Sequence, residues 1–128
     1  VRDLMSECCG VVRSEGGLRD GLARLEEVAG RAERLEVRPD IAGYADLAHA
    51  FDLHGSLLAA RATLDCALER RETRGAHNRA DFPDEDPKLQ VNLVWNLGGT
   101  VTHDAVPSPS SADFSVELDL DSPDRLLE

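Results

Sequence analysis

The chain of 128 residues has few aromatic and few basic side chains. Aromatic residues make up 4% of it, and 14 Lys and Arg face 25 Asp and Glu, so that the formal net charge is −11. Nucleic acids and anionic membrane surfaces reward basic side chains, and single-stranded nucleic acid also rewards aromatic ones. Both classes of partner are therefore disfavoured.

Long apolar runs are also missing. No apolar stretch reaches the ~20 residues that a membrane-spanning helix needs, so we expect no direct membrane insertion. The chain opens at Val1, inside an amphipathic pattern and without a signal peptide, as we expect of an excerpt from a longer protein. Three cysteines fit neither a disulfide framework nor a C-x-x-C site. We expect Cys8 and Cys66 to be buried thiols of a reduced compartment.

Motifs that usually carry catalysis or cofactors are missing as well. The chain has no Ser motif with a glycine elbow, no phosphate-binding loop and no G-x-G-x-x-G fingerprint. His49, His54 and His103 are dispersed, so each is interpreted as a solvated or core histidine. The sequence therefore predicts no catalytic residue, no cofactor-binding residue and no metal ligand in this chain.

Apolar residues recur at helical spacing through the first two thirds of the chain. They predict a short helix over 4–12, an interruption at Gly16-Gly17, a helix over 18–35 closed by Pro39, and a third over 41–68 that bends or breaks near 54–56. The fold class is mainly α, an antiparallel three-helix bundle of the spectrin-repeat kind. This bundle and the loop that ends it would span residues 1–86.

A β-hairpin and an acidic tail are expected after Pro83. Alternation over 89–97 and 101–105 predicts two strands, which form an extension over residues 87–107. A three-residue loop, Gly98-Gly99-Thr100, would set Leu97 opposite Val101, Trp95 opposite His103 and Leu93 opposite Ala105. Residues 108–128 begin with a Pro/Ser linker and continue as an acidic tail or a third strand.

The segment from Glu72 to Asp86 carries a basic cluster followed by an acidic one. Arg74 and Arg79 could hold a carboxylate while His77 moves a proton. In the alternative that we favour, the arginines bind carboxylates and backbone groups and His77 packs or caps. A metal site from His77, Asp81 and Asp84 matches no known ligand spacing.

The stretch Glu72–Pro83 resembles the E-S-R-G-A-H-x-R-x-D-[YF]-P segment of the succinate dehydrogenase/fumarate reductase flavoprotein family, with Thr73 in place of the usual Ser. The sequence upstream is also similar to that of the family, from Leu4-Met5 through Cys9-Gly10-Val11-Val12-Arg13 to the leucine-rich helix. The hairpin with its Gly-Gly turn also resembles the family. The resemblance covers residues 1 to about 106.

The resemblance implies the C-terminal domain of an FAD-dependent oxidoreductase that interconverts succinate and fumarate. FAD is implied for the parent protein and not for this chain, because the family's flavin and substrate motifs lie upstream of this domain. The implied partners are the flavin-binding and capping domains and the iron–sulfur subunit. The implied location is cytoplasmic, or peripheral at the cytoplasmic membrane through partner subunits.

We therefore expect a structural or docking domain that is not catalytic alone. Its candidate interface residues are those of the family motif: Glu72, Arg74, Gly75, His77, Arg79 and Asp81. Two alternatives stay open. One is the C-terminal domain of an L-aspartate oxidase-like flavoprotein, and the other is a free-standing helical interaction module.

Overall fold

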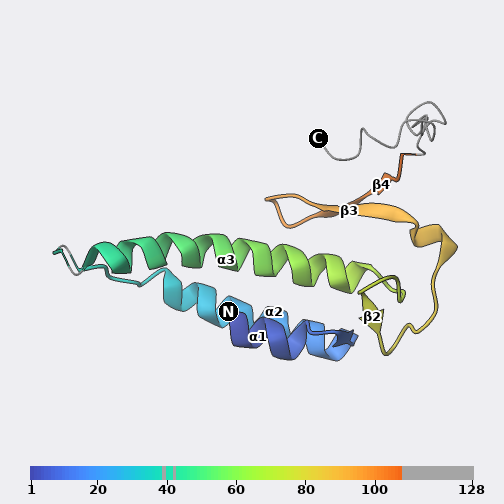
Figure 1. The fold of residues 1–128 in the computed structure, drawn as a ribbon, viewed down its shortest axis with the longest axis horizontal. Helices are drawn as coiled ribbons and strands as arrows, with labels where there is room; N and C mark the ends of the chain where they lie inside the picture. The colour runs from blue at the N-terminus through green and yellow to red at the C-terminus, as the bar shows by residue number, and fades with distance from the viewer. Residues whose placement is uncertain (39, 42, 108–128) are drawn as a thin grey trace, which may run out of the picture.

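The computed structural model describes residues 1–38, 40, 41 and 43–107. This part of the chain folds into three α-helices, one short 3₁₀ helix and two small β pairs (Figure 1). In chain order the elements are α1 (Arg2–Cys8), β1 (Val12–Arg13), α2 (Glu15–Ala32), α3 (Gly43–Glu69), β2 (Asn78–Arg79), η1 (Pro87–Leu89), β3 (Val91–Trp95) and β4 (Val101–Ala105). The expectation of a mainly helical fold with a small antiparallel hairpin is confirmed.

The two long helices, α2 and α3, run antiparallel along each other, and the short α1 lies against one half of the pair (Figure 1). Ser14 begins α2 as its N-cap, where its hydroxyl accepts a hydrogen bond from Gly17 N at 3.3 Å. None of the helices in the described ranges is long and apolar enough to cross a bilayer.

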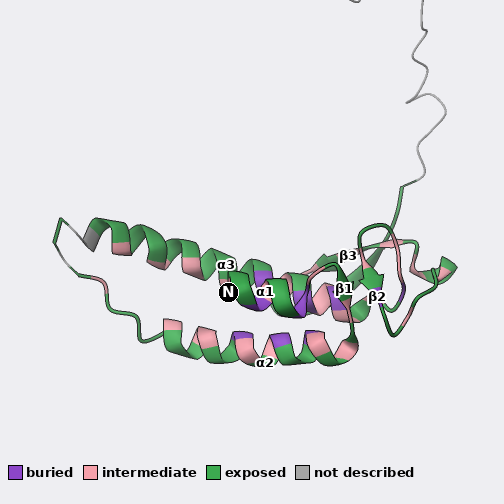
Figure 2. Ribbon diagram, turned by 60° about the horizontal axis from the view of Figure 1, so that its bottom comes forward, coloured by how far each residue is buried: buried purple, intermediate pink, exposed green. Residues whose placement is uncertain are grey.

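The core lies where α1 covers α2 and α3. Leu18 and Leu64 are fully buried there, and the rest of the cluster consists of Leu4, Cys9, Leu25, Ala60 and Ala67. Gly21 lets α1 and α2 approach, because a Cβ at this position would stand 2.8 Å from the Cβ of Cys8. Figure 2 shows the buried residues gathered in this half of the helix pair.

Several helix boundaries differ from those predicted. The first helix ends at Cys8, and Val11 and Val12 are exposed instead of continuing its apolar stripe. Gly10 sits at this exit, where a Cβ would be 2.9 Å from Ser6 O. Gly16-Gly17 does not interrupt a helix, because both glycines lie in the first turn of α2, which a side-chain cap stabilises.

The third helix is continuous from Gly43 to Glu69, so the predicted bend near 54–56 is wrong. Its first half does not bury the predicted stripe, since Tyr44 and Phe51 are 73% and 72% exposed. The second helix ends at Ala32 rather than at Leu35, which is 52% exposed. Both differences lie where α1 no longer covers the pair.

The hairpin of β3 and β4 packs on α3. Trp95 Nε1 donates to Asp65 Oδ2 at 2.9 Å, and His103 Nε2 lies 2.9 Å from Glu69 Oε1. These contacts hold both strands against the C-terminal part of α3.

The predicted hairpin register is wrong by two residues. Trp95 pairs with Val101, Leu93 with His103 and Val91 with Ala105. The loop consists of Leu97, Gly98 and Gly99, because Gly99 has a φ of 77° and its N–H closes the turn onto Asn96 O at 2.8 Å. Leu97 is therefore exposed in the loop, although the apolar residues still share one face as expected.

A second β pair joins the connection between α1 and α2 to the segment that follows α3. β1 and β2 pair in parallel, with Val12 opposite Asn78 and Arg13 opposite Arg79. The linker, the acidic tail and the alternative third strand predicted for 108–128 lie outside the described residues, as does Pro39.

Candidate functional site

The candidate site is the segment between α3 and the hairpin, residues 70–86, which we call the junction loop. It contains two tight turns. Arg74 and His77 exchange backbone hydrogen bonds of 2.8 and 3.0 Å, and Phe82 N donates to Arg79 O at 3.1 Å. Gly75, inside the first turn, has a φ of 56°, a left-handed conformation that glycine adopts without strain. Gly75 therefore serves this turn and does not directly follow the helix, which ends at Glu69.

Glu72 is the centre of the first half of the junction loop. It is fully buried, and its carboxylate accepts hydrogen bonds from Arg70 Nη1 at 2.6 Å, from Arg74 Nε and Nη2 at 2.9 Å each, and from Asp86 N at 2.9 Å. The hydrogen bond from Arg74, together with those from Asp86 N and Arg70, outweighs burial and lowers the pKa of Glu72 to about 2. The carboxylate is thus ionised at neutral pH and fully compensated.

The two arginines that hold Glu72 also bind backbone oxygens farther along the chain. Arg70 donates to Leu89 O and Val91 O, each at 2.8 Å, at the start of the hairpin. Arg74 donates to Asp86 O at 3.3 Å and forms an ion pair with Glu85. The buried carboxylate is therefore linked to the first residues of β3.

Arg79 is the centre of the second half. Its side chain is fully buried, and its Nη1 donates to Ala67 O at 2.8 Å and to Arg70 O at 3.2 Å, which are carbonyls at the end of α3. Its Nε and Nη2 donate to the two carboxylate oxygens of Asp81 at 2.8 Å each. The guanidinium carbon also lies 4.9 Å from the ring centroid of Phe82.

Asp81 connects this arginine to the other long helix. Its Oδ2 accepts a hydrogen bond from Glu15 N at 2.8 Å, the first residue of α2. The hydrogen bonds from Arg79 hold the pKa of Asp81 well below its usual range. One bidentate ion pair therefore connects the end of α3 to the beginning of α2.

His77 is half-buried between the first turn and β1. Arg13 Nη1 lies 2.6 Å from its Nδ1, and Arg70 O lies 3.1 Å from its Nε2. A guanidinium only donates, so Nδ1 accepts and Nε2 carries the proton that it donates to Arg70 O. Burial lowers the pKa of His77, and the neighbouring charges of Arg13 and Arg79 lower it further.

The six predicted motif residues are thus brought together, and most of their polar atoms face the protein. Glu72, Arg74, His77, Arg79 and Asp81 bind one another, helix ends and backbone oxygens of the hairpin. This geometry agrees with the predicted binding of carboxylates and backbone groups by the arginines. His77 has no free ring nitrogen for proton transfer, because Arg13 and Arg70 O occupy both.

Three contributing residues were not predicted. Arg13 binds His77, Arg70 binds both Glu72 and the hairpin, and the Thr73 hydroxyl accepts from Arg79 N at 2.9 Å. Arg13 belongs to the Gly-Val-x-Arg pattern that follows the first helix, and that pattern was the available signal. Its partner lies 64 positions away, so spacing alone could not connect them.

The described residues do not bring metal ligands together. No group of three His, Cys, Asp or Glu side chains within 1–38, 40, 41 and 43–107 could hold a metal ion. The polar atoms of His77 and Asp81 already bind arginines and backbone groups. The cysteines are free; Cys8 and Cys9 are buried and Cys66 is half-buried, and burial raises the pKa of each thiol.

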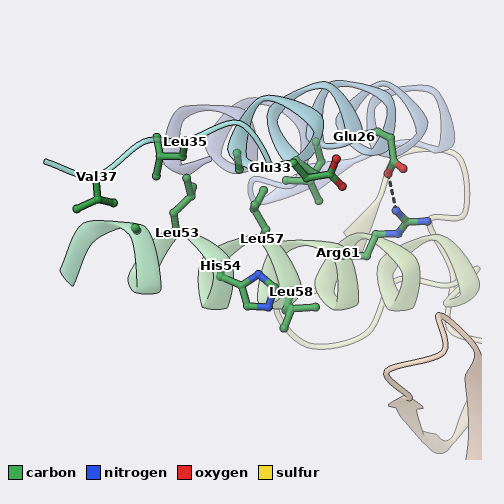
Figure 3. A pocket seen from close by; sticks show the side chains of 13 residues that line it. Glu26, Glu33, Leu35, Val37, Leu53, His54, Leu57, Leu58 and Arg61 are labelled. Carbon is green, nitrogen blue, oxygen red and sulfur yellow. Dashed lines mark hydrogen bonds and ion pairs between the residues drawn. The ribbon is translucent and has the colours of Figure 1, made fainter. Parts of the chain in front are cut away.

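FAD does not fit the residues described here. A cavity between α2 and α3 is mostly apolar, and its charged lining consists of Glu26, Glu33 and Arg61 (Figure 3). Arg61 already pairs with Glu26 at 2.8 Å, so the carboxylates would repel a pyrophosphate.

Fold and loop together define a helical domain in which ion pairs of the junction loop connect α2, α3 and the hairpin. The family described as "Fumarate reductase flavoprotein C-term" matches residues 1–107. The chain therefore belongs to this family of flavoprotein C-terminal domains, as the resemblance implied.

Individual relatives agree with this assignment. An uncharacterized FAD-dependent oxidoreductase of Methanocaldococcus jannaschii is 30% identical over 94 residues, which are 73% of this chain and 17% of that protein. An L-aspartate oxidase of Rhodospirillum rubrum is 37% identical over 110 residues, 86% of this chain and 34% of that protein. Among solved structures, the E. coli quinol fumarate reductase FrdA has a similar fold, with a TM-score of 0.74 and 23% identity over 84% of this chain and 20% of its own.

The chain spans between about a sixth and a third of the length of the curated relatives named here. What those whole proteins bind or catalyse is therefore a property of longer polypeptides.

Proposed function

We propose that this chain is the C-terminal structural and docking domain of an FAD flavoprotein that interconverts succinate and fumarate by hydride transfer. The chain does not perform the chemistry alone. One observation carries the proposal: the charged residues of the family motif are committed to holding α2, α3 and the hairpin together. A motif with this arrangement stabilises the relative positions of these elements, because its polar atoms already have partners within the domain.

The rest of the assignment follows from this role. Residues 1–86 form a bundle of the spectrin-repeat kind, and residues 87–107 extend the same domain. Its partners are the flavin-binding and capping domains of the parent polypeptide and the iron–sulfur subunit. The parent enzyme is cytoplasmic, or peripheral at the membrane through those subunits. Homology to flavoprotein subunits supports the flavin-binding domains and the iron–sulfur subunit as partners.

The test compares Arg74→Ala and His77→Ala with Arg71→Ala in the full-length parent enzyme. Arg71 is the matched control, because it is an exposed arginine in the same loop. We expect the first two variants to lower the unfolding temperature while turnover per bound flavin stays unchanged. A large loss of turnover per flavin at unchanged stability would refute the structural role.

L-aspartate oxidase is the second candidate, because the Rhodospirillum rubrum relative matches more of this chain than the other relative named above. Substrate choice distinguishes the two. We expect succinate to bleach the flavin absorbance of the parent enzyme anaerobically, and L-aspartate to leave it unchanged. The reverse result would favour the oxidase and leave the structural role of the domain intact.

A third candidate, a free-standing helical interaction module, is disfavoured by membership in a family of flavoprotein C-terminal domains. An upstream FAD-binding region in the same reading frame would exclude it.

A further inference from the structure

The outer edge of β4 is open in the part of the chain that the structure describes. Asn96 N donates to Thr100 O at 2.9 Å, which makes these residues a hydrogen-bonded pair of the ladder. Such pairs alternate with non-hydrogen-bonded ones, so the backbone groups of Val101, His103 and Ala105 point away from β3. No hydrogen bond between described residues reaches these outward groups. They form a row of N–H and C=O groups to which another strand can bind.

The opposite edge of the hairpin is partly occupied. Leu89 O and Val91 O, at the start of β3, each accept a hydrogen bond from Arg70 at 2.8 Å. The guanidinium of Arg70 therefore stands where a strand that pairs with β3 would have to pass. Of the two edges, β4 is the one that can accept a further strand along its whole length.

The face of β4 that packs on α3 is incompletely covered. His103 Nε2 lies 2.9 Å from Glu69 Oε1, yet the two side chains are 39% and 48% exposed. Val101 is half-buried and Ala105 is exposed on the same face. A two-stranded ribbon is marginally stable in water, and a third strand beside β4 would extend this face and cover these side chains.

We propose that residues 114–118 bind the open edge of β4 as a third, antiparallel strand of the hairpin sheet. Phe114, Val116 and Leu118 alternate with Ser115 and Glu117, which is the pattern of a strand with one covered face. The segment has five residues, as β4 does. Its apolar side chains lie on the α3 side of the sheet, and its polar ones face solvent.

The connection between the two strands fits this arrangement. Eight residues, 106–113, lie between them, which is enough to reverse the chain at the end of β4. Pro107 and Pro109 lie in this connection and cannot donate to a ladder, so β4 does not continue through them. Strands that follow each other in the sequence usually pair, and here the adjacent edge is the open one.

Charge selects the register of the new pair. Three registers pair at least three residues of the segment and keep its apolar side chains on the α3 side. In one of them Asp113 stands opposite Asp104, and in another Glu117 does. The third sets Ser115 opposite Asp104 and Glu117 opposite Thr102, and it alone pairs all five residues. Like charges directly opposite each other are destabilising, so we expect the third register.

A second copy of the chain is a poorer occupant of this edge. The net charge of −11 makes two copies repel each other. A segment tethered by a short connection is instead present at an effective concentration on the order of millimolar. The acidic side chains on the solvent side of the new strand would also keep further strands from adding to it.

A scan of cysteine pairs in the full-length parent protein measures the register. Thr102→Cys is combined in turn with Ser115→Cys, Glu117→Cys or Asp119→Cys, and peptide mass spectrometry follows each disulfide under mild oxidation. Residues 102 and 117 form a non-hydrogen-bonded pair in the proposed register, with Cα atoms about 4.5 Å apart, which a disulfide can span. We expect this disulfide to form about tenfold faster, or more, than the other two.

Hydrogen exchange reports the same edge without added cysteines. Val116→Pro removes an N–H that faces His103 in the proposed strand, so we expect the amides of β4 that point outward to exchange about tenfold faster. Glu117→Pro is the matched control, because the N–H of residue 117 faces solvent there. This control should leave the exchange of β4 nearly unchanged.

Four results would overturn the proposal. Equal disulfide rates for the three pairs mean that the segment has no fixed position, and a fastest rate at position 115 or 119 means a different register. Rapid exchange of β4 in the unaltered protein means that its edge is open. Protection that survives Val116→Pro means that another domain or, if it rises with protein concentration, a second copy covers the edge.

Discussion

At the scale of single residues, the junction loop places two charged side chains, Glu72 and Arg79, in full burial with every polar atom engaged. Among the described residues, no buried side-chain nitrogen or oxygen is left without a partner. Burying a charge is costly unless ion pairs and hydrogen bonds compensate it. The energetic role of each residue therefore depends on its partners.

Glu72→Gln tests this dependence. The change leaves Arg70 and Arg74 without their shared carboxylate, so we expect the free energy of unfolding to fall by about 3 kcal/mol. Urea denaturation of the chain measures it. Glu85→Gln removes a largely exposed partner of Arg74 and should cost less than about 1 kcal/mol. Equal effects of the two substitutions would contradict the account.

The histidine predicts a pH dependence. The folded-state pKa of His77 lies below the unfolded value of 6.5, so its contribution to stability is present above that pH and is lost as the pH falls. We expect the free energy of unfolding to decrease between about pH 7 and about pH 5, before the carboxylates titrate. His77→Asn should flatten this slope, whereas His49→Asn, which changes an exposed histidine, should not. An unchanged slope in His77→Asn would refute the assignment.

At the scale of elements, hydrophobic periodicity predicted that three helices and a hairpin exist, while their ends depended on contacts that periodicity does not contain. The first helix ends at Cys8, because the chain turns at Gly10 and then forms β1, which pairs with β2. The hairpin register follows from Gly99, which occupies the loop position with positive φ. From the sequence alone, either Gly98 or Gly99 could occupy that position, so the register was not determined.

Two glycines of α2 give a matched pair for testing helix packing. A Cβ at Gly21 would stand 2.8 Å from Cys8 Cβ and 3.1 Å from Leu64 Cδ2, so Gly21→Ala should destabilise the chain by about 1–3 kcal/mol. Gly30 has no such neighbour within 4 Å, so Gly30→Ala should stabilise it by roughly 0.5–1 kcal/mol. Thermal or urea unfolding compares them. Stabilisation by both would mean that α1 does not pack closely on α2.

At the scale of the whole molecule, the resemblance of the loop motif predicted the family correctly, and composition alone did not. The motif residues were predicted as interface candidates, but Glu72 and Arg79 are fully buried within the domain. Long-range partners such as Arg13 and His77 become visible only in the fold. The open apolar cavity between α2 and α3 was not predicted either, because a hydrophobic stripe in a sequence does not show what covers it.

Flavin binding is a prediction at this scale. We expect the 128-residue chain alone to bind no FAD, because the charged lining of the cavity between α2 and α3 disfavours a pyrophosphate. Flavin fluorescence on titration with the chain should stay unchanged. Quenching that saturates with the chain would contradict this expectation.

The pair of Arg79 and Asp81 has a consequence for the electrostatics of the long helices. A helix carries partial positive charge at its N-terminus and partial negative charge at its C-terminus. Arg79 places its cation at the negative end of α3, and Asp81 places its anion at the positive end of α2. Exchanging the two residues would preserve their mutual attraction and set each charge against a helix dipole. The order of these charges in the sequence is therefore dictated by the opposite directions of the helices that they join.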